Sequence, residues 1–394
     1  MNKFIIPNLI FDTGTYKKRD SRLPLRLPFE LDYNDEKNLI VQKSNEKVRR
    51  ALERYYSSGG YASSPLGEGQ YAKKQGDDIF KVIKQSLLER KKTVKNTTFL
   101  EIGAGYGYLL YLLKKEGAKD ILGLEPGKEG IEGSKKYGVP FMHDFFPSQS
   151  LKKDFDFIFS YAVLEHIENP LFILKEIYKK LNDKGMTFIA VPDNEKKLEI
   201  ADLSIISHQH FNYFTKNSLS DLMEKAGFKN VKVIESKRRS IIFAWGAKKL
   251  DFVKKILVKK NLSDRPIFKK FTSNFLKNVK TIQKLIRGHE KDGRKIGLYA
   301  PYSNLLGLLK FKNNPRIFQG DKFKHGKFMA GYPRPIEPPD NLLKQPLDVL
   351  FIAPIDYDKE IRENLKKIGV KAEIVSLKTI YEKNSGIKYK ISSK

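Results

Sequence analysis

The stretch Thr98-Phe-Leu-Glu-Ile-Gly-Ala-Gly-Tyr-Gly-Tyr-Leu-Leu110 decides the fold of this 394-residue chain. A short apolar run leads into three closely spaced glycines, and residues with helical spacing follow them. A strand, a glycine-rich turn and a helix in this order present backbone N–H groups to a nucleotide-like ligand. The glycines are spaced Gly103-x-Gly105-x-Gly107, and Tyr108 stands where a dinucleotide-binding motif has its third glycine. The turn therefore predicts a nucleotide-like ligand but departs from the dinucleotide motif.

Two acidic residues flank this turn. Glu101 lies at the end of the predicted strand, and Glu125 closes the next apolar run. One carboxylate before the turn and one at the tip of the second strand suit a ligand with an ammonium group and a ribose diol. S-adenosylmethionine (SAM) has both groups, so we expect SAM rather than NAD as the cofactor. The expected cofactor-binding residues are Glu101, Gly103, Ala104, Gly105, Gly107, Tyr108, Glu125, Pro126, Asp144, Phe145, Ser160, Tyr161 and Ala162.

The later members of this set follow the third and fourth predicted strands. Asp144 comes directly after the strand Val139–Met142, where it can bond the adenine amino group while Phe145 packs on the ring. A helix cap is the alternative role for Asp144. The run Ser160–His166 follows the apolar strand Phe155–Ser160, and ligands bind at the carboxyl edge of such a sheet.

Composition narrows the class of protein. There are no cysteines, which excludes disulfides and thiolate metal sites, and no apolar run of about 18 residues that would span a membrane. The apolar start Met1–Phe11 is too short for a signal peptide, so we expect a cytoplasmic protein. The net charge of +29 has two interpretations: a general lysine bias, or a surface for nucleic acid, membrane or an anionic substrate, densest at Lys248–Lys284.

The motifs resemble a known family. Phe99–Gly107, Leu122–Pro126 and Phe155–His166 are similar to the class I SAM-dependent methyltransferases. His208-Gln-His-Phe-Asn-Tyr-Phe214 resembles the His-Glu-His-x-x-Tyr-Phe element of the sugar-nucleotide C-methyltransferases, and Tyr61-Ala-Ser-Ser64 resembles their tyrosine–serine loop. Three later segments resemble the C-terminal domain of that family: Lys295–Pro301, Gly331–Pro335 and Asp348–Pro354.

The resemblance and the alternation of strands and helices over 97–246 imply the architecture. We expect an α/β fold, with a doubly wound, Rossmann-like SAM methyltransferase domain at 61–246. A degenerate N-terminal module (1–60) precedes it, and a basic helical connector (247–292) leads to a smaller C-terminal α/β domain (293–394).

The resemblance also implies the residues that handle the acceptor. His210 would be the base, Tyr61 and Tyr213 would position the acceptor, and His166 would contact the substrate or orient its loop. Ser64, His208 and Gln209 are the expected substrate-binding residues. The expected substrate is a nucleotide-linked sugar or a related glycan precursor, and the expected oligomeric state is a monomer or a homodimer.

The chain departs from this family in two ways. The family usually begins with a cysteine-ligated zinc module, so Pro24–Pro28 and Asn38–Gln42 look like strands of a zinc-free version. Gln209 stands where the family has glutamate, which removes the second base that α-proton abstraction favours. Methylation at carbon, oxygen or nitrogen therefore stays open.

Three other interpretations compete with this one. His208 and His210 alternate in an extended segment and invite a metal, but no third ligand lies nearby in the sequence, so no metal site is expected. The charge favours an RNA methyltransferase as the alternative function; yet Ser160–Glu165 replaces the Asn-Pro-Pro-Tyr type of motif, and we do not expect a nucleic-acid partner. A non-catalytic scaffold conflicts with the intact glycine turn and its carboxylates.

Overall fold

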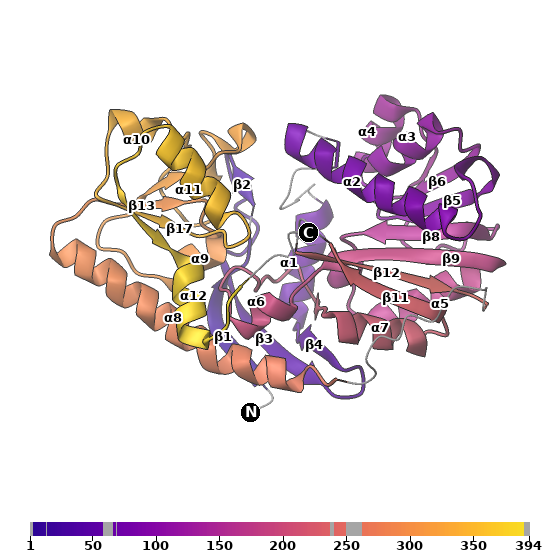
Figure 1. Ribbon diagram of the computed structural model, residues 1–394, viewed down its shortest axis with the longest axis horizontal. Helices are drawn as coiled ribbons and strands as arrows, with labels where there is room; N and C mark the ends of the chain where they lie inside the picture. Colours follow the sequence, from indigo (N-terminus) through magenta and orange to yellow (C-terminus); the bar gives the residue numbers. More distant parts are fainter. Residues whose placement is uncertain are drawn as a thin grey trace.

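The computed structural model describes residues 3–12, 14–57, 66–67, 69–236, 240–249 and 262–389. Three parts lie side by side, with the N-terminal strands between a large α/β part and a smaller C-terminal α/β part (Figure 1). Tyr61 and Ser64, both expected at the acceptor site, lie outside the described residues. No helix formed by the described residues is long and apolar enough to cross a membrane.

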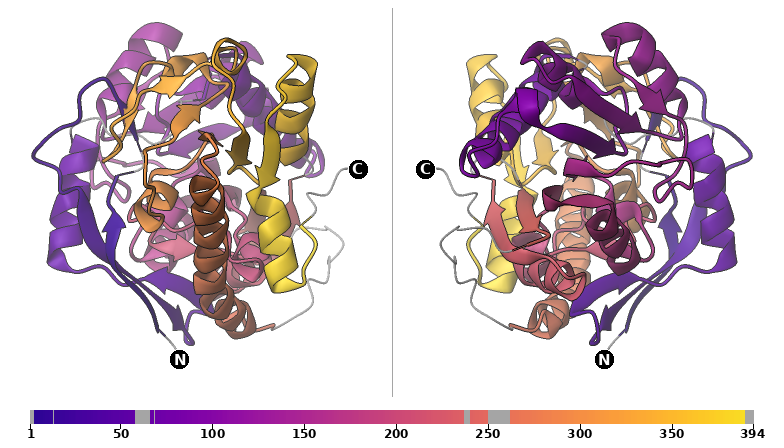
Figure 2. Two further views of the ribbon diagram at one scale, coloured as in Figure 1. Left: turned by 90° about the vertical axis from the view of Figure 1, so that its left-hand side faces the viewer. Right: turned by 90° about the vertical axis from the view of Figure 1, so that its right-hand side faces the viewer.

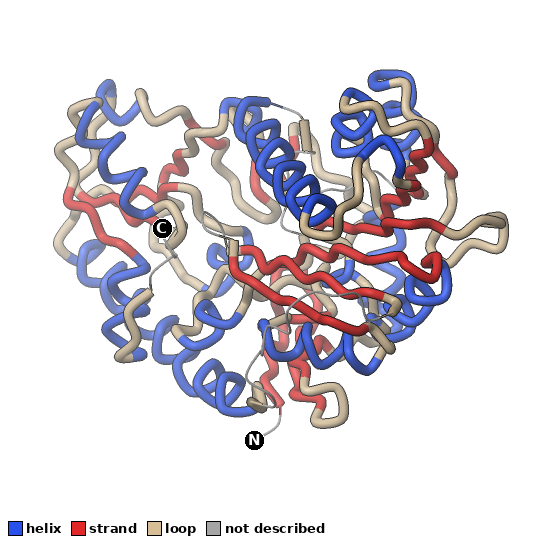
Figure 3. The backbone as a smooth tube through the Cα atoms, turned by 45° about the vertical axis from the view of Figure 1, so that its right-hand side comes forward, coloured by secondary structure: helices blue, strands red, loops and turns tan. Residues whose placement is uncertain are grey.

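Seven strands of the described residues form the large sheet, which runs through the α/β part in Figure 3. Their order is β11 (Lys229–Glu235), β12 (Ile241–Ala247), β9 (Leu181–Pro192), β8 (Phe155–Tyr161), β5 (Thr98–Ile102), β6 (Asp120–Leu124) and β7 (Phe141–Met142). Strands β9 to β7 are parallel, and β12 and β11 add an antiparallel pair at one edge. This arrangement confirms the predicted α/β methyltransferase-type sheet.

Alternate residues of the buried strands face opposite helix layers, as the period of two in a strand requires. Phe99 and Phe157 pack toward α2 (Gly69–Leu88) and α3 (Tyr108–Lys115). Leu100 and Ile158 pack toward α5 (Pro170–Lys180) and α7 (Lys216–Lys225). The long apolar runs of β5 and β8 follow from this burial on both faces.

The N-terminal strands form a second sheet with the order β1 (Lys3–Ile10), β3 (Arg26–Asn34), β4 (Leu39–Gln42) and β10 (Asn212–Tyr213). Strand β10 comes from the large α/β part, so this sheet joins the two parts. The register of β1 and β3 shifts between Ile6 and Leu9, opposite Pro28, which a strand tolerates at a bulge because proline has no N–H to donate. Helix α1 (Glu46–Ser57) follows.

The C-terminal part is a five-stranded parallel sheet. Its strands are β16 (Ile336–Glu337), β14 (Arg316–Phe318), β13 (Ile296–Tyr299), β17 (Val349–Ile352) and β18 (Glu373–Ser376). Its helices are α9 (Ser303–Leu308), α10 (Asn341–Lys344), α11 (Asp358–Lys367) and α12 (Leu377–Ser385). The short strands β2 (Thr15–Tyr16) and β15 (Phe328–Met329) pair the N-terminal and C-terminal parts.

Helix α8 (Arg265–Lys291) connects the parts and lies alongside α12 (Figure 2). Its Phe271 and Phe275 rings pack on Phe4 of β1, with ring centroids 5.1 and 4.8 Å apart. One hydrophobic core therefore includes β1, β3, α8 and the C-terminal sheet. The expected domain boundaries stay predictions, and this core extends across all four expected units.

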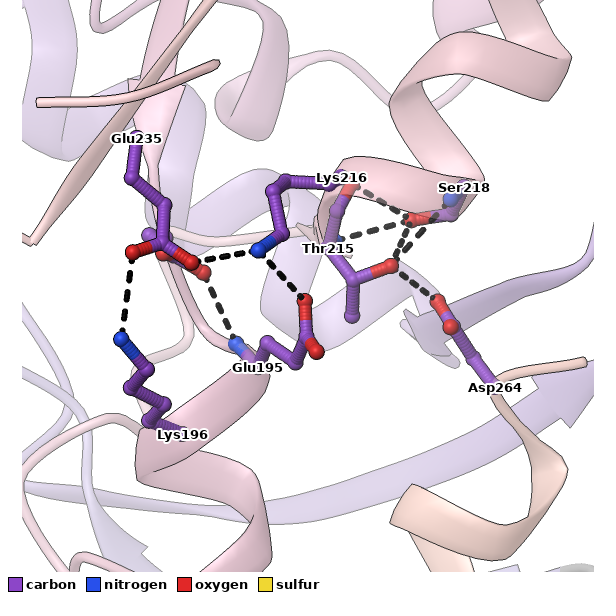
Figure 4. A network of polar contacts seen from close by, with 8 residues as sticks. Glu195, Lys196, Thr215, Lys216, Ser218, Glu235 and Asp264 are labelled. Atoms are coloured by element: carbon purple, nitrogen blue, oxygen red, sulfur yellow. Dashed lines mark hydrogen bonds and ion pairs between the residues drawn. The ribbon is translucent and has the colours of Figure 1, made fainter. Parts of the chain in front are cut away.

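A polar network fixes the segment around β10 (Figure 4). Thr215 caps α7 by accepting from the Ser218 N–H, and its hydroxyl donates to Asp264 Oδ2 at 2.6 Å, just before α8. Lys216 pairs with Glu235 of β11, and so does Lys196 of α6 (Glu195–Glu199) at 3.1 Å. The network holds the ends of β10 and α7 in place, and the segment that contains His210 lies directly before them.

Candidate active site

The glycine turn after β5 has the conformation that its sequence predicts. Gly103, Gly105 and Gly107 have φ angles of +66°, +52° and +73°, in the left-handed region that favours glycine. A Cβ on Gly103 would lie 2.4 Å from Val163 Cγ2, so this glycine lets the loop after β8 pack on the turn. A Cβ on Gly105 would meet nothing within 4 Å. The turn therefore has one packed side and one open side that can accept a ligand.

Glu125 holds the turn from the tip of β6. Its two carboxylate oxygens accept hydrogen bonds of 2.9 Å from the backbone N–H groups of Gly105 and Gly127. Burial raises the pKa of Glu125, and the two N–H groups act in the opposite direction. This carboxylate therefore connects the glycine turn to the start of α4 (Lys128–Tyr137), next to the open side of Gly105.

Glu101 is the unsatisfied group of this site. Its side chain is in a residue only 3% exposed, and its Oε2 atom has no hydrogen-bond partner among the described residues. Burial and the neighbouring Glu125 carboxylate raise the pKa of Glu101 well above its usual value. A backbone hydrogen bond from Leu110 acts against this rise. A buried carboxylate whose Oε2 lacks a partner among the described residues suits the ammonium group of SAM, which would supply the missing hydrogen bond and the charge. The residues present thus fit the expected cofactor.

Helix α4 packs directly on the turn, which the sequence analysis missed. A Cβ on Gly133 would lie 2.2 Å from the backbone oxygen of Tyr106, and a Cβ on Gly130 would lie 3.2 Å from Glu125 Cβ. The signal was present, because two glycines three positions apart share one face of a helix.

Other predicted cofactor residues surround the turn. The Asp144 carboxylate accepts from Ser148 Oγ at 2.6 Å and from the Phe145 N–H at 2.8 Å, and the first bond lowers its pKa most. Asp144 thus orders its own loop and caps no helix, because no helix lies in the described stretch between β7 and β8. Phe145 is 73% exposed, so its ring is open to stacking. Ala162 has a φ of +53°, a strained conformation of the kind found at functional sites.

The remaining predicted cofactor residues are placed as follows. Ala104 is buried in the turn, Ser160 is buried at the end of β8, and Pro126 is exposed beyond β6. Tyr108 Oη donates to Asp77 of α2 at 2.8 Å, and Tyr161 Oη bonds Gln75 of the same helix. These two hydroxyls therefore attach α2 to the site.

The acceptor side is built on the loop after β8. This loop contains the one-turn helix η2 (Leu164–His166). The backbone oxygen of Glu165 in η2 accepts a hydrogen bond of 2.8 Å from the Phe211 N–H. Asn212 Nδ2 donates to the backbone oxygens of Leu164 at 3.3 Å and Ile167 at 2.6 Å. These bonds place His210 beside His166, with ring centroids 5.0 Å apart. Val163, which packs on Gly103, belongs to the same loop, so the acceptor side adjoins the glycine turn.

The tautomer of His166 follows from its partners. Its Nδ1 lies 2.8 Å from the backbone oxygen of Gln209, and because a carbonyl only accepts, Nδ1 carries the proton. The Tyr56 hydroxyl lies 3.3 Å from the same nitrogen. The other nitrogen, Nε2, lies 3.8 Å from Glu165 Oε1. The lone pair of His166 is therefore on the nitrogen that lies near the Glu165 carboxylate.

Burial controls ionisation in this cluster. It raises the pKa of Glu165 to about 8. It lowers the pKa of His166, and burial together with His166 lowers the pKa of His210 to about 3. Both imidazoles are thus neutral at ordinary pH. In the part of the chain that the structure describes, no group hydrogen-bonds to the His210 imidazole.

Two predicted acceptor residues make structural contacts instead. His208 is fully buried between Phe11 and Phe29, at ring-centroid distances of 5.5 and 5.4 Å, and its Nε2 lies 3.3 Å from the Pro28 oxygen. Tyr213 Oη donates to the Ser207 oxygen at 3.3 Å, within its own loop. We propose supporting roles for both, in place of the substrate contact expected for His208 and the acceptor contact expected for Tyr213.

Gln209 reaches the cluster through its backbone oxygen on His166, so a backbone role accompanies the expected substrate contact. Two cluster residues were missed as site residues. Tyr56 contacts His166 from α1, and Glu165 precedes His166 in the sequence. The position of Glu165 beside a predicted site histidine was the available signal.

Comparison with known families identifies the large α/β part. Residues 71–233 match the family described as "Methyltransferase domain", and they contain the glycine turn with Glu101 and Glu125. The chain is a SAM-dependent methyltransferase.

The similar curated proteins match part of this methyltransferase. A tRNA U34 carboxymethyltransferase of Helicobacter pylori is 26% identical over 212 residues, which are 47% of this chain and 79% of that protein. One of Hydrogenovibrio crunogenus is 25% identical over 164 residues, 38% of this chain and 49% of that protein. The match to the second relative thus spans about half of its length. The resemblance to sugar-nucleotide C-methyltransferases stays a prediction.

Among solved structures, magnesium protoporphyrin IX methyltransferase from Synechocystis PCC 6803 is similar with a TM-score of 0.40 and 13% identity, over 51% of this chain and 100% of that one. The 1,6-didemethyltoxoflavin N1-methyltransferase of Burkholderia thailandensis has a TM-score of 0.39 and 14% identity, over 60% and 100%. Scores this low carry no argument about the acceptor.

Proposed function

We propose that this methyltransferase acts on a nucleotide-linked sugar or a related glycan precursor. The observation that carries the proposal is the buried cluster of Glu165, His166 and His210 beside the glycine turn. A buried cluster suits a small acceptor that is enclosed when it binds, because burial excludes water from the reacting groups.

The cluster also contains a carboxyl group that could replace the one missing at Gln209. SAM, when bound, offers a methyl group on a sulfonium, and an acceptor in line with it must lose a proton if it is neutral. His210 is a neutral imidazole without a hydrogen-bond partner among the described residues, and the Glu165 carboxylate lies in the same cluster. Glu165 can therefore provide the carboxylate that Gln209 does not, and methylation at carbon, oxygen or nitrogen stays open.

The side chains of Glu165 and His210 have opposite pKa shifts, an arrangement typical of acid–base pairs. Burial raises the pKa of Glu165 and lowers that of His210. His210 is thus ready to accept a proton at neutral pH, although its low pKa makes it a weak base. Glu165 becomes a stronger base once its own proton has left.

Methylation of RNA is the second candidate. Both curated relatives described above are tRNA U34 carboxymethyltransferases, and the net charge of +29 would favour a polyanion. The comparisons favour this candidate over a sugar. The matches to these two relatives cover only 47% and 38% of this chain. The resemblance to sugar-nucleotide enzymes also includes segments of the C-terminal part, and for that reason the nucleotide sugar stays our first candidate.

One experiment separates the candidates. The full chain is incubated with isotopically labelled SAM and either a panel of nucleotide sugars or total tRNA, and mass spectrometry follows the label. We expect one labelled methyl on a nucleotide sugar, lost in His210→Ala, while SAM binding remains and the remote control His289→Ala is active. Label in tRNA with none in any sugar would replace the proposal with the second candidate.

A further inference from the structure

The acceptor cluster has the composition of a metal site. We propose that Glu165, His166 and His210 bind one divalent metal ion, for which Zn²⁺ is the best fit. The role of the ion in holding the acceptor rests on the proposed function, but its binding does not, and can be measured without SAM or an acceptor.

The spacing of the donor atoms carries the proposal. One ligand atom from each of the three residues lies within 4.8 Å of the other two. The gap of 3.8 Å between His166 Nε2 and Glu165 Oε1 is too long for a hydrogen bond. Two donors on a tetrahedral zinc ion, each about 2.1 Å from it, are roughly 3.4 Å apart. The His166–Glu165 pair would need to approach by a few tenths of an ångström to bind an ion, and the other pairs, which lie within 4.8 Å, by at most roughly 1.4 Å.

The groups behind the ligands favour the same conclusion. A ligating histidine usually donates its other N–H to a carbonyl or carboxylate, which fixes the tautomer. His166 does this, since its Nδ1 donates to the Gln209 oxygen at 2.8 Å and leaves Nε2 free to ligate. The backbone of Glu165 is held by the Phe211 N–H.

The unsatisfied atoms are the independent observation. Glu165 is 1% exposed, and its Oε2 has no hydrogen-bond partner among the described residues. Within the same described part, its one neighbour of the ion-pair type is His166, a buried imidazole. A buried carboxyl group without a cation is costly to ionise, and a divalent ion would stabilise its carboxylate form.

The donor set indicates the ion and its use. Two imidazole nitrogens and one carboxylate oxygen form a common zinc site, in which a fourth position stays open for water or substrate. That position would take an oxygen of the acceptor next to the glycine turn. With the ion bound, His210 would be a ligand instead of the base, and the ion would assist loss of the acceptor proton by lowering the pKa of the bound oxygen. The sequence analysis missed this site because it sought a third ligand near His208, which packs between Phe11 and Phe29, whereas the fold brings in Glu165.

The test measures metal binding directly. The full chain is freed of metal with a chelator and titrated with Zn²⁺ by calorimetry, and Co²⁺ is added to a second sample for its absorption spectrum. We expect one equivalent of Zn²⁺ to bind, and a Co²⁺ spectrum of nitrogen and oxygen ligation. Glu165→Gln and His210→Ala should each weaken Zn²⁺ binding at least tenfold, roughly the loss reported even for outer-shell changes.

Controls keep folding and binding apart. SAM binding should persist in both variants, which shows that they fold, and His325→Ala should bind Zn²⁺ like the wild type. Equal Zn²⁺ affinity in the wild type and His210→Ala would overturn the proposal. A wild type that binds no Zn²⁺ yet methylates a nucleotide sugar with a His210 requirement would also overturn it, and would leave the proposed function standing.

Discussion

Replacing Glu101 with glutamine tests the cofactor site, because two measurements should change in opposite directions. The substitution keeps the shape of the side chain and removes the group that can ionise. In the ligand-free protein the Oε2 atom of this group has no hydrogen-bond partner among the described residues, whereas in the complex the carboxylate would hold the SAM ammonium group.

The structure gives the expected magnitudes. A hydrogen bond to a charged group contributes about 1.5–3 kcal/mol, so SAM should bind about 10- to 150-fold more weakly to Glu101→Gln. The pKa of Glu101 is raised above the usual 4.5, so the folded state retains the proton, and wild-type stability falls as pH rises above that value. The variant lacks this loss, and at pH 8 it should be more stable by about 1–3 kcal/mol, the usual cost of an unsatisfied buried group.

Calorimetry with SAM and urea unfolding without ligand, each at pH 6 and pH 8, measure the two effects. Glu116→Gln is the matched control, because Glu116 is an exposed residue paired with Lys84 and should change little. A variant that binds SAM like the wild type would refute the assignment of Glu101. Loss of stability at pH 8 would show that the carboxylate has a structural partner that the reasoning omits.

Three further substitutions test the neighbouring structure. Gly133→Ala should weaken SAM binding and destabilise the protein by about 1–3 kcal/mol, because its Cβ would lie 2.2 Å from the Tyr106 oxygen. The control Gly288→Ala has open space around its Cβ and should instead stabilise helix α8 by up to about 1 kcal/mol. Equal effects of the two substitutions in urea unfolding would contradict the packing of α4 on the glycine turn. Burial lowers the pKa of His208 from 6.5 to about 4, so wild-type stability should fall as pH drops from 6.5 toward 4; His208→Leu should remove up to about 3 kcal/mol of that loss, and an unchanged acid slope of unfolding would refute it. Asn212→Ala should reduce methyl transfer more than SAM affinity, because it frees the carbonyls of Leu164 and Ile167; equal loss of both in a steady-state assay would show that this loop also forms the cofactor site.

The methyltransferase part was predictable because its signals are local. The three glycines predict a tight turn, and all three have the positive φ angles that glycine favours. The apolar runs of β5 and β8 indicate strands that are buried on both faces. The antiparallel pair β11 and β12 extends this sheet at one edge. Helix α8 (Arg265–Lys291) lies within the region predicted as a basic helical connector (247–292).

The acceptor side was harder to predict from the sequence because its contacts join residues that are far apart along the chain. The His166 ring meets a backbone oxygen at residue 209, and strand β10 pairs with β4 of the N-terminal sheet. The alternation of His208 and His210 predicted an extended segment, which was wrong. Residues 208–209 form a turn in which the His210 N–H donates to the Ser207 oxygen at 3.2 Å, and His208 enters an aromatic core. Strand β3 was obscured by Pro28, which the bulge opposite it accommodates.

A crystal structure of the full chain with S-adenosylhomocysteine tests the central claim most directly, namely that the glycine turn and the histidine cluster form one active site. We predict that the amino group of the ligand contacts the Glu101 carboxylate and its ribose contacts Glu125, with the sulfur facing His166 and His210. A ligand bound elsewhere, or a sulfur that faces away from both histidines, would contradict the account.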